Sequence, residues 1–185
     1  MEILWRTAMS IDGRLATADA SLDFLGTIAA EGEALAEFPA FVASVDAILL
    51  GADTLRWLVR GGHGWPHGDK PTWLISHDEA LAAQLGPLEH PLRRRAGALA
   101  PVLAELEASG ARRVWLCGGG AIANQVLALD RLDEIEVVIA PAVLGAGPNL
   151  FGDQPLAARA FTLVECARFA GTAVKLRWRR DRAAG

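Results

Sequence analysis

A glycine triplet between two apolar segments constrains the fold of this chain more than any other feature. Gly118-Gly119-Gly120 follows the short apolar run of residues 114–117 and precedes residues 121–129, where apolar side chains recur at helical spacing. The pattern predicts a strand, a tight turn and a helix. Because a helix start exposes unpaired N–H groups and the positive end of the helix dipole, we expect a phosphate here, such as that of a nucleotide. A turn that binds no ligand explains the same glycines, and the sequence leaves both interpretations open.

Length and composition set broad limits on the kind of protein. A chain of 185 residues with 52% hydrophobic and 22% charged residues is long enough for one domain, residues 1–185, and too apolar for a disordered segment. The net charge of −4 gives no electrostatic signal for nucleic-acid binding. No segment has the order of a signal peptide, and no apolar run approaches the ~20 residues that span a bilayer. We therefore expect a single-domain cytoplasmic protein that binds neither nucleic acid nor membranes.

Two basic clusters and two cysteines need an explanation. Residues 93–95 are consecutive arginines, which we expect in a solvated loop. Residues 177–180 hold three more arginines and are expected at the frayed end of the last strand. Cys117 and Cys166 both lie within apolar runs, so we expect two buried free thiols.

The histidines do not fall at the spacing of a metal site, and we expect them in loops or at the surface: His63, His67, His77 and His90. His77-Asp78-Glu79 matches the H-x-E element of nucleobase deaminases, but the P-C-x-x-C ligands that would complete a zinc site are missing. The sequence therefore predicts no metal centre. It also lacks G-x-S-x-G and G-K-[ST], which removes the simplest support for acyl transfer and nucleotide hydrolysis.

Strand and helix patterns alternate along the chain, which favours an α/β domain with a largely parallel sheet. Strands are expected at residues 3–9, 47–50, 72–76, 114–117, 135–140, 161–168 and 172–179. Helices are expected at residues 29–44, from residue 53, from about residue 78, at residues 99–108 and at residues 121–129. Pro39 predicts a kink or an early break in the first helix. Ala170-Gly171 joins the last two strands and predicts an antiparallel pair that closes the sheet.

Polar or glycine residues also follow two other expected strands. Gly51-Ala52-Asp53-Thr54 and Ser76-His77 stand where a helix or loop begins. In open α/β sheets, ligands bind outside the carboxyl ends of the strands, and three such ends predict an extended ligand. Helix capping explains Thr54 and Ser76 equally well, and it explains Asp78 better.

A Rossmann dinucleotide fold is excluded, although residues 118–123 fit G-x-G-x-x-A. That fold needs the motif after its first strand and an acidic residue about 20 positions later, at the end of the next strand. Here the motif lies beyond mid-chain, and Asp133, Glu134 and Glu136 stand at the start of the following strand.

Five segments together resemble a known family. Ala8-Met9-Ser10-Ile11-Asp12-Gly13-Arg14-Leu15-Ala16 is similar to the opening of the bacterial dihydrofolate reductase-like family that includes the C-terminal reductase domain of the bifunctional riboflavin-biosynthesis protein. Four further segments resemble the same family in the same order: residues 46–54, Trp65-Pro66 with Lys70-Pro71, residues 117–121 and residues 139–151. The resemblance implies a three-layer fold with a mixed, mostly parallel central sheet, helices on both faces and an antiparallel C-terminal strand pair.

The resemblance also implies a site for NADPH along the carboxyl edge of the sheet. It implies nicotinamide contacts from Ala8, Leu15 and Ala16, pyrophosphate contacts from Gly118, Gly119, Gly120, Ala121 and Ile122, and adenosine contacts from Gly51, Thr54, Ser76 and His77. The implied reaction is hydride transfer to a pteridine- or pyrimidine-like small molecule, in which the protein supplies alignment and polarity. Relatives commonly pair through the sheet and its last strands, so we expect a homodimer. The alternatives are a nucleotide-binding protein without turnover and a folate reductase.

Three residues are candidates for a catalytic role: Asp12, Ser10 and Glu31. The resemblance places Asp12 and Ser10 in a mobile flap beside the nicotinamide, where a closing loop excludes water. A simple turn, in which Asp12 bonds its own backbone, is the alternative. Glu31 is the nearest match to the acid that folate reductases carry on their first helix, and a solvated acid at a helix start explains it equally well.

Three departures from the family pattern limit what the resemblance implies. Ala52 stands where folate reductases often carry an arginine for the 2′-phosphate, so the choice between NADPH and NADH stays open. Arg14 replaces a lysine common in the riboflavin enzymes, and Leu55-Arg56-Trp57 replaces their Asp-Asn-Pro. The ribosylamino-pyrimidine substrate of those enzymes therefore does not follow for this chain.

Overall fold

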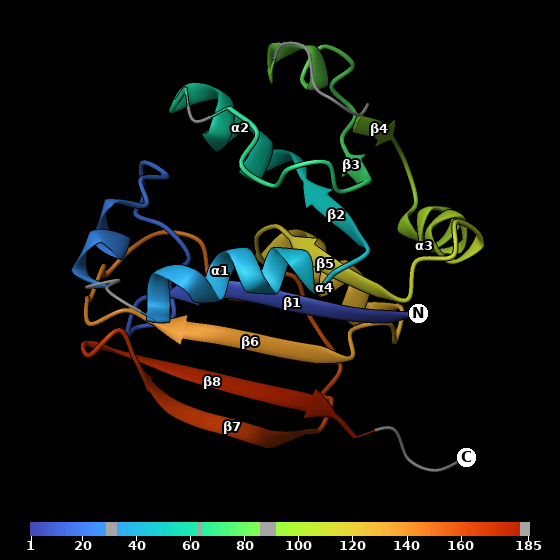
Figure 1. The fold of residues 1–185 in the computed structure, drawn as a ribbon. Coiled ribbons are helices and arrows are strands. Elements are labelled where there is room, and N and C mark those ends of the chain that lie inside the picture. Colours follow the sequence, from blue (N-terminus) through green and yellow to red (C-terminus); the bar gives the residue numbers. More distant parts are fainter. Residues whose placement is uncertain (29–32, 63, 86–91, 182–185) are drawn as a thin grey trace.

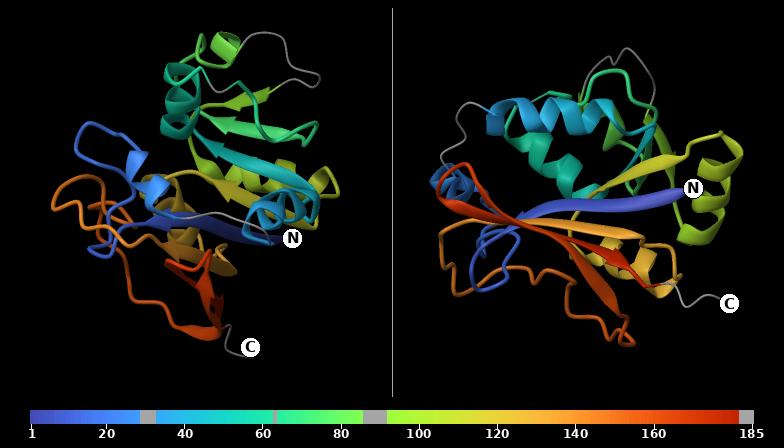
Figure 2. Two further views of the ribbon diagram at one scale, coloured as in Figure 1. Left: turned by 60° about the vertical axis from the view of Figure 1, so that its left-hand side comes forward. Right: turned by 60° about the horizontal axis from the view of Figure 1, so that its bottom comes forward.

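The computed structural model has a single central sheet with helices on both of its faces (Figures 1 and 2). It describes residues 1–28, 33–62, 64–85 and 92–181. Within these residues the strands are β1 (Glu2–Met9), β2 (Ala47–Gly51), β3 (Thr72–Ile75), β4 (Leu92–Arg95), β5 (Arg113–Cys117), β6 (Glu134–Ile139), β7 (Phe161–Phe169) and β8 (Ala173–Arg180). The helices are α1 (Glu33–Ala43), α2 (Ala52–Arg60), α3 (Leu99–Ala108) and α4 (Gly120–Ala128), with short 3₁₀ turns η1 (Asp23–Thr27) and η2 (Ala82–Leu85).

The strand order is β4-β3-β2-β5-β1-β6-β8-β7. All pairs from β4 to β6 are parallel, whereas β8 runs antiparallel to both β6 and β7. The parallel strands therefore end at one common edge of the sheet, as the alternating sequence pattern predicts. We call this edge the carboxyl edge.

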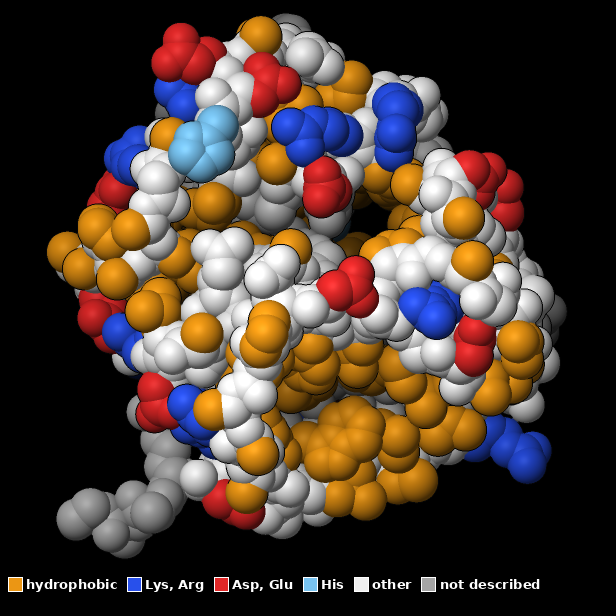
Figure 3. Space-filling model, turned by 180° about the vertical axis from the view of Figure 1, so that it is seen from behind, with side chains coloured by type: hydrophobic (Ala, Val, Ile, Leu, Met, Phe, Trp, Pro, Cys, Tyr) orange, Lys and Arg blue, Asp and Glu red, His pale blue; other side chains and the backbone are white. Residues whose placement is uncertain are grey.

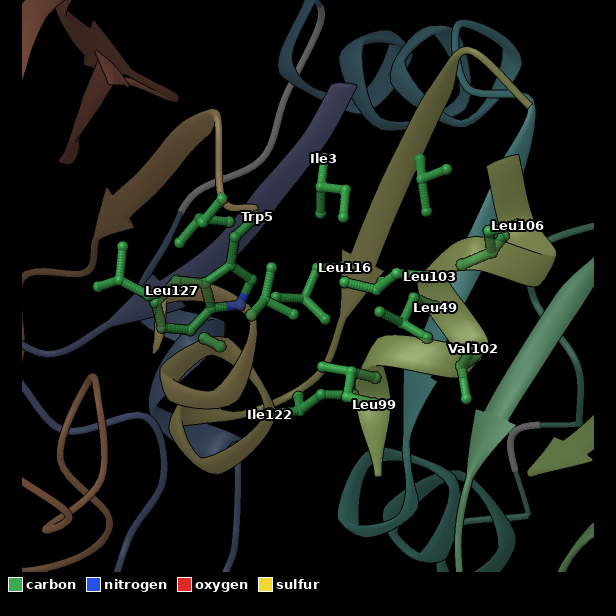
Figure 4. Packing of buried hydrophobic residues seen from close by; sticks show 14 of the residues in the cluster. Ile3, Trp5, Leu49, Leu99, Val102, Leu103, Leu106, Leu116, Ile122 and Leu127 are labelled. Atoms are coloured by element: carbon green, nitrogen blue, oxygen red, sulfur yellow. The ribbon is translucent and has the colours of Figure 1, made fainter. Parts of the chain in front are cut away.

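Two apolar cores flank the sheet because successive side chains of a strand point to opposite faces. Trp5 of β1 and Leu116 of β5 pack with α3 and α4 on one face, as Figure 4 shows. Leu4 and Trp115 pack on the other face with α1 and α2. Every residue of β2 is buried, as expected for a strand that is covered on both sides. In the part of the chain that is described, every helix is too short or too polar to traverse a lipid bilayer.

Two helix expectations differ from the structure. Pro39 does not end the first helix, since α1 continues to Ala43. The rings of Phe38 and Phe41 lie 5.7 and 5.2 Å from that of Trp115, and this packing holds the helix on both sides of the proline. Within the described residues 78–85, the helix expected from Asp78 does not form, because side-chain oxygens bind the amides that would begin it. Asp78 N donates to Ser76 Oγ, and Ala80 N donates to Asp78 Oδ1.

The basic clusters are also more ordered than expected. Residues 93–95 form most of the edge strand β4 instead of a solvated loop. Residues 177–180 end β8 without fraying, since Arg177 and Arg179 reach Glu134 and Arg180 reaches Asp130. Charged side chains are accepted in these strands because carboxylates on neighbouring elements neutralise them.

One of the two cysteines is exposed, contrary to expectation. Cys117 is buried, but Cys166 lies on β7 beside Leu176 of β8 and is exposed. The reason is that the last two strands extend past the helices, which leaves part of one sheet side uncovered. Figure 3 shows hydrophobic side chains gathered at this end of the molecule. We call this surface, formed by Leu163, Cys166, Val174, Leu176 and Trp178, the β7/β8 apolar face.

Candidate functional site

The centre of the carboxyl edge is formed by two adjacent strands that both lead into glycines. β2 ends at Gly51, which precedes α2, and β5 is followed by Gly118. A Cβ atom at Gly118 would lie 2.6 Å from Ile122 Cγ2 and 3.3 Å from Gly51 N. Gly118 is therefore needed because the strand ends and α4 approach each other closely.

The other two glycines of the triplet have different surroundings. A Cβ atom at Gly120 would lie 2.4 Å from the Leu150 carbonyl oxygen and 2.5 Å from Gly152 N, so this glycine lies under another backbone segment. Gly119, the N-cap residue of α4, has only Leu15 Cδ1 within reach, at 3.9 Å. Of the three, Gly119 is thus the position where a ligand can approach the first N–H groups of the helix.

Asp12 anchors the loop that follows β1. Its carboxylate accepts hydrogen bonds from Ser10 Oγ at 2.6 Å, Gly145 N at 2.8 Å and Leu144 N at 3.0 Å. These bonds, above all the one from Ser10, lower the pKa of Asp12 to about 2. At neutral pH the carboxylate is ionised, so it serves as an acceptor and not as a proton donor.

The same loop is fastened along its length to a second segment, residues 142–152, which we call the strap. Ile11 N donates to the Ala142 carbonyl, Leu15 N to that of Pro148, and Leu150 N to that of Gly13. Arg14 adds side-chain hydrogen bonds to the Gly147 carbonyl and to Asn149 Oδ1. Gly147 has a φ of +120°, and a Cβ atom there would lie 2.0 Å from the Ala16 carbonyl oxygen. Residues 10–17, which we call the flap, are therefore bonded to the strap at both ends.

The strap in turn is attached to the glycine turn. Asn124 of α4 donates to the carbonyls of Phe151 and Gln154, each at 3.1 Å. The Phe151 ring packs edge-on against Trp5 at 5.2 Å, and Trp5 Nε1 donates to the Gly118 carbonyl at 2.9 Å. Flap, strap and glycine turn thus form one connected unit.

The structure brings one of the predicted nicotinamide residues, Leu15, close to the glycine turn and another, Ala16, against the strap. Leu15 lies next to Gly119, and Ala16 is buried beside Gly147. Ala8 lies near the end of β1 and is half-buried, while Ser10 is fully buried. Glu31, the third catalytic candidate, lies outside the described residues.

The predicted adenosine residues lie on neighbouring strands. Thr54 is half-buried in the first turn of α2, where Gly51 is the N-cap. Ser76 is buried, and its hydroxyl accepts from Asp78 N at 3.0 Å in a local turn, not at the start of a helix. His77 is exposed. Sequence reasoning missed Arg94, whose Nη1 donates to the Ser76 carbonyl at 3.1 Å.

A buried histidine was also missed. His67 lies in a loop, between α2 and β3, as expected, but it is buried there with its ring 4.8 Å from the rings of Trp65 and Trp115. Its Nε2 lies 3.9 Å from the Sγ of Cys117, the residue that directly precedes the glycine turn. Burial lowers the pKa of His67 to about 4 and raises that of Cys117 to about 12. Trp65, the aromatic residue two positions before the histidine, is a sequence signal for this burial.

Comparison of the sequence with known proteins identifies a family and a relative. Residues 59–175 match the profile of a family described as the RibD C-terminal domain. The chain is also similar to the uncharacterized protein YwjB of Bacillus subtilis (strain 168), with 29% identity over 144 residues, which cover 78% of this chain and 79% of that protein.

Solved structures share the fold. The chain is similar to a Shewanella sp. PV-4 protein provisionally assigned to riboflavin biosynthesis, with a TM-score of 0.84 and 23% identity over 98% of this chain and 100% of that one. It is also similar to the diaminohydroxyphosphoribosylaminopyrimidine deaminase/5-amino-6-(5-phosphoribosylamino)uracil reductase of Thermotoga maritima, with a TM-score of 0.72 and 15% identity over 97% of this chain and 56% of that one. The expected dihydrofolate reductase-like architecture, with its antiparallel last strand pair, is confirmed.

Proposed function

Because the chain belongs to the RibD C-terminal domain family, we propose that it is an NADPH-dependent reductase that transfers a hydride to a pteridine- or pyrimidine-like small molecule. The observation that carries this proposal is the open approach to Gly119 at the start of α4, with Leu15 of the flap beside it. A phosphate-accepting turn and an apolar side chain next to each other suit the two ends of a nicotinamide ribosyl pyrophosphate.

The donor groups along the edge fit an extended dinucleotide. The free N–H groups of α4 at Gly119, Gly120, Ala121 and Ile122 would hold the pyrophosphate. Ala8, Leu15 and Ala16 would contact the nicotinamide, and Gly51, Thr54, Ser76 and His77 would contact the adenosine half. When bound, the cofactor supplies the hydride, and the chain supplies orientation and exclusion of water.

Asp12 and Ser10 contribute to this function by holding the flap in place. Since the Asp12 carboxylate is ionised and bonded to Leu144 N and Gly145 N, its role is to hold the flap against the strap. The flap in turn places Leu15 beside Gly119. The rate of hydride transfer then depends on how firmly the flap is held. Holding the flap is the role that we assign to Asp12 and Ser10.

The substrate class is proposed from the family. The Thermotoga maritima relative is described as a reductase of a phosphoribosylamino uracil, a substituted pyrimidine. The experiment is to follow NADPH oxidation with purified protein against a panel of pyrimidines and pteridines, including dihydrofolate. Oxidation with one class of heterocycle supports the proposal and identifies the class. Tight cofactor binding without oxidation across the panel would instead indicate a nucleotide-binding protein without turnover.

We also propose that the protein is a homodimer that pairs through the β7/β8 apolar face. Leu163 is 51% exposed and Val174 is 42% exposed on this surface, and contiguous apolar area of this kind is typical of an interface. Light scattering on the native protein at micromolar concentration is expected to give a dimer. Leu163→Glu is expected to give a folded monomer, and a monomeric native protein would contradict the proposal.

A further inference from the structure

The three arginines of the edge strand β4 make three different contacts. Arg93 lies with its guanidinium 4.5 Å from the Trp73 ring centre. Arg95 holds both carboxylate oxygens of Glu105, at 2.5 and 2.6 Å. Arg94 points to the opposite face from its two neighbours, because side chains alternate along a strand, and there it meets the residues that follow β3.

Arg94 has weaker partners than Arg95. Its Nη1 donates to the Ser76 carbonyl at 3.1 Å, and its Nη2 makes a single contact with Glu79 Oε1 at 3.0 Å. The Glu79 side chain is 85% exposed, and an ion pair with so exposed a partner contributes only about 0–1 kcal/mol. A dianionic phosphate forms shorter, bidentate bonds with a guanidinium and can displace such a carboxylate.

The register of the sheet sets Arg94 beside the proposed adenosine site. Gly51 of β2 pairs with Ile75 of β3, so Ser76 lies level with Ala52, the first residue of α2. Arg94 pairs with Leu74, whose side chain lies in the core on the α1/α2 side of the sheet. The Arg94 guanidinium at the Ser76 carbonyl therefore lies at the end of β3, the strand next to the one that leads into α2.

Among the described residues, the two carboxylates nearest this point on α2 and after β3 already have partners of their own. Asp53 on α2 pairs with Arg56 at 2.8 Å. The Asp78 carboxylate accepts from Ala80 N. Ala52 has no side chain long enough to reach a phosphate.

We propose that Arg94 selects NADPH over NADH by pairing with the 2′-phosphate of the adenosine ribose, in place of Glu79. The inference rests on the proposed function and adds the residue that decides the choice of cofactor, which the sequence leaves open at Ala52. The 2′-phosphate is the group that distinguishes the two cofactors, so a cation at this point affects one of them and not the other.

The test is calorimetric titration of the full chain with NADPH, NADH, 2′,5′-ADP and 5′-ADP. The native protein is expected to bind the 2′-phosphorylated member of each pair at least about 10-fold more tightly. Arg94→Gln is expected to lose most of this preference, about 10- to 100-fold, with affinity for NADH and 5′-ADP unchanged within about twofold. Arg93→Gln is the matched control, one residue away on the opposite face, and is expected to keep the preference. Glu79→Gln is expected to increase it.

Three results would overturn the assignment to Arg94. Equal native affinities within each pair would do so and would leave the reductase proposal intact. An equal loss of affinity for both members of a nucleotide pair in Arg94→Gln would show that the substitution disturbs the site as a whole. The same loss of preference in Arg93→Gln would show that the effect is not specific to Arg94. Thermal melting of each variant confirms that it is folded before titration. If the native protein binds none of the four nucleotides, the proposed function itself fails.

Discussion

The two ends of the carboxyl edge are built differently. At the flap end, Asp12 and Arg14 make hydrogen bonds to backbone groups of the strap, in addition to their bonds with the side chains of Ser10 and Asn149. At the adenosine end, Arg94 makes one backbone bond, to the Ser76 carbonyl, and pairs with Glu79, whose side chain is 85% exposed, while Asp53, itself 89% exposed, pairs with Arg56. A charged group bonded to the backbone fixes a loop, whereas one paired with an exposed side chain can exchange its partner at low cost. The flap end is therefore a scaffold, and the adenosine end is the place where a ligand can take over existing contacts.

The largest effect expected from this difference concerns two adjacent glycines. Gly120→Ala places a Cβ atom against backbone atoms of residues 149–152, which cannot move without breaking the bonds of the strap. We expect a loss of about 3 kcal/mol in the free energy of unfolding. Gly119→Ala is the matched control and is expected to cost less than about 1 kcal/mol, since its Cβ meets only Leu15 Cδ1 at 3.9 Å. Urea unfolding of both variants measures the difference in stability. Equal stabilities would contradict the distinction between a packed Gly120 and an open Gly119.

His67, between the two ends, is expected to make stability depend on pH. Its pKa is lowered to about 4 in the folded protein, against ~6.5 when unfolded, so the unfolded chain binds the extra proton first as the pH falls. The free energy of unfolding therefore decreases between pH 6.5 and 4, by about 2 kcal/mol at pH 5. Urea unfolding at pH 7.5 and 5 measures this. His67→Phe is expected to remove its share of the dependence, while the same change at exposed His77 leaves it in place.

A smaller effect is expected for the open glycine of the turn. Gly119→Asp puts a carboxylate where the pyrophosphate is proposed to lie, and repulsion is expected to weaken NADPH binding about 10-fold or more. Gly119→Asn, similar in size and uncharged, is expected to lose less. Calorimetric titration separates the two. An unchanged affinity in the aspartate variant would assign the turn to packing alone.

The smallest effect is expected at Asp12. Asp12→Asn keeps the shape of the turn but removes the charge that attracts the strap amides, so we expect a reductase rate lower by about threefold and NADPH affinity within about twofold. Because the folded pKa is depressed to about 2, the stabilisation is complete above pH ~4 and is lost as the pH falls from there to about 2. An unchanged rate with an accepted substrate would favour the simple turn.

The fold was largely predictable because its signals are local. Apolar runs such as residues 47–50 and the glycine triplet determine strand and turn within a few positions. β4 was not predictable, because an edge strand of arginines has no apolar pattern and is stabilised by Glu79, Glu105 and Trp73 from other elements. The exposure of Cys166 likewise depends on which side of the sheet the helices leave uncovered.

The candidate site also has parts that could be predicted from the sequence and parts that could not. The glycine turn and the ends of β1 and β2 could be located from sequence, since they follow recognisable strands. The contacts of Asp12 with residues 144 and 145 join segments more than 130 positions apart, so no local pattern indicates them. The approach of His67 to Cys117 depends on tertiary packing in the same manner. Sequence therefore locates the backbone of the site better than the partners of its side chains.

Trp5 gives this molecule a built-in optical reporter. The chain has six tryptophans and no tyrosine, so its near-ultraviolet emission comes from indole alone. The Trp5 indole is buried, hydrogen-bonded to the Gly118 carbonyl and packed on Phe151. Indole emits where a reduced nicotinamide absorbs and an oxidised one does not. If a dinucleotide binds at this turn as proposed, resonance energy transfer from the tryptophans, Trp5 among them, would report its redox state in the unlabelled protein.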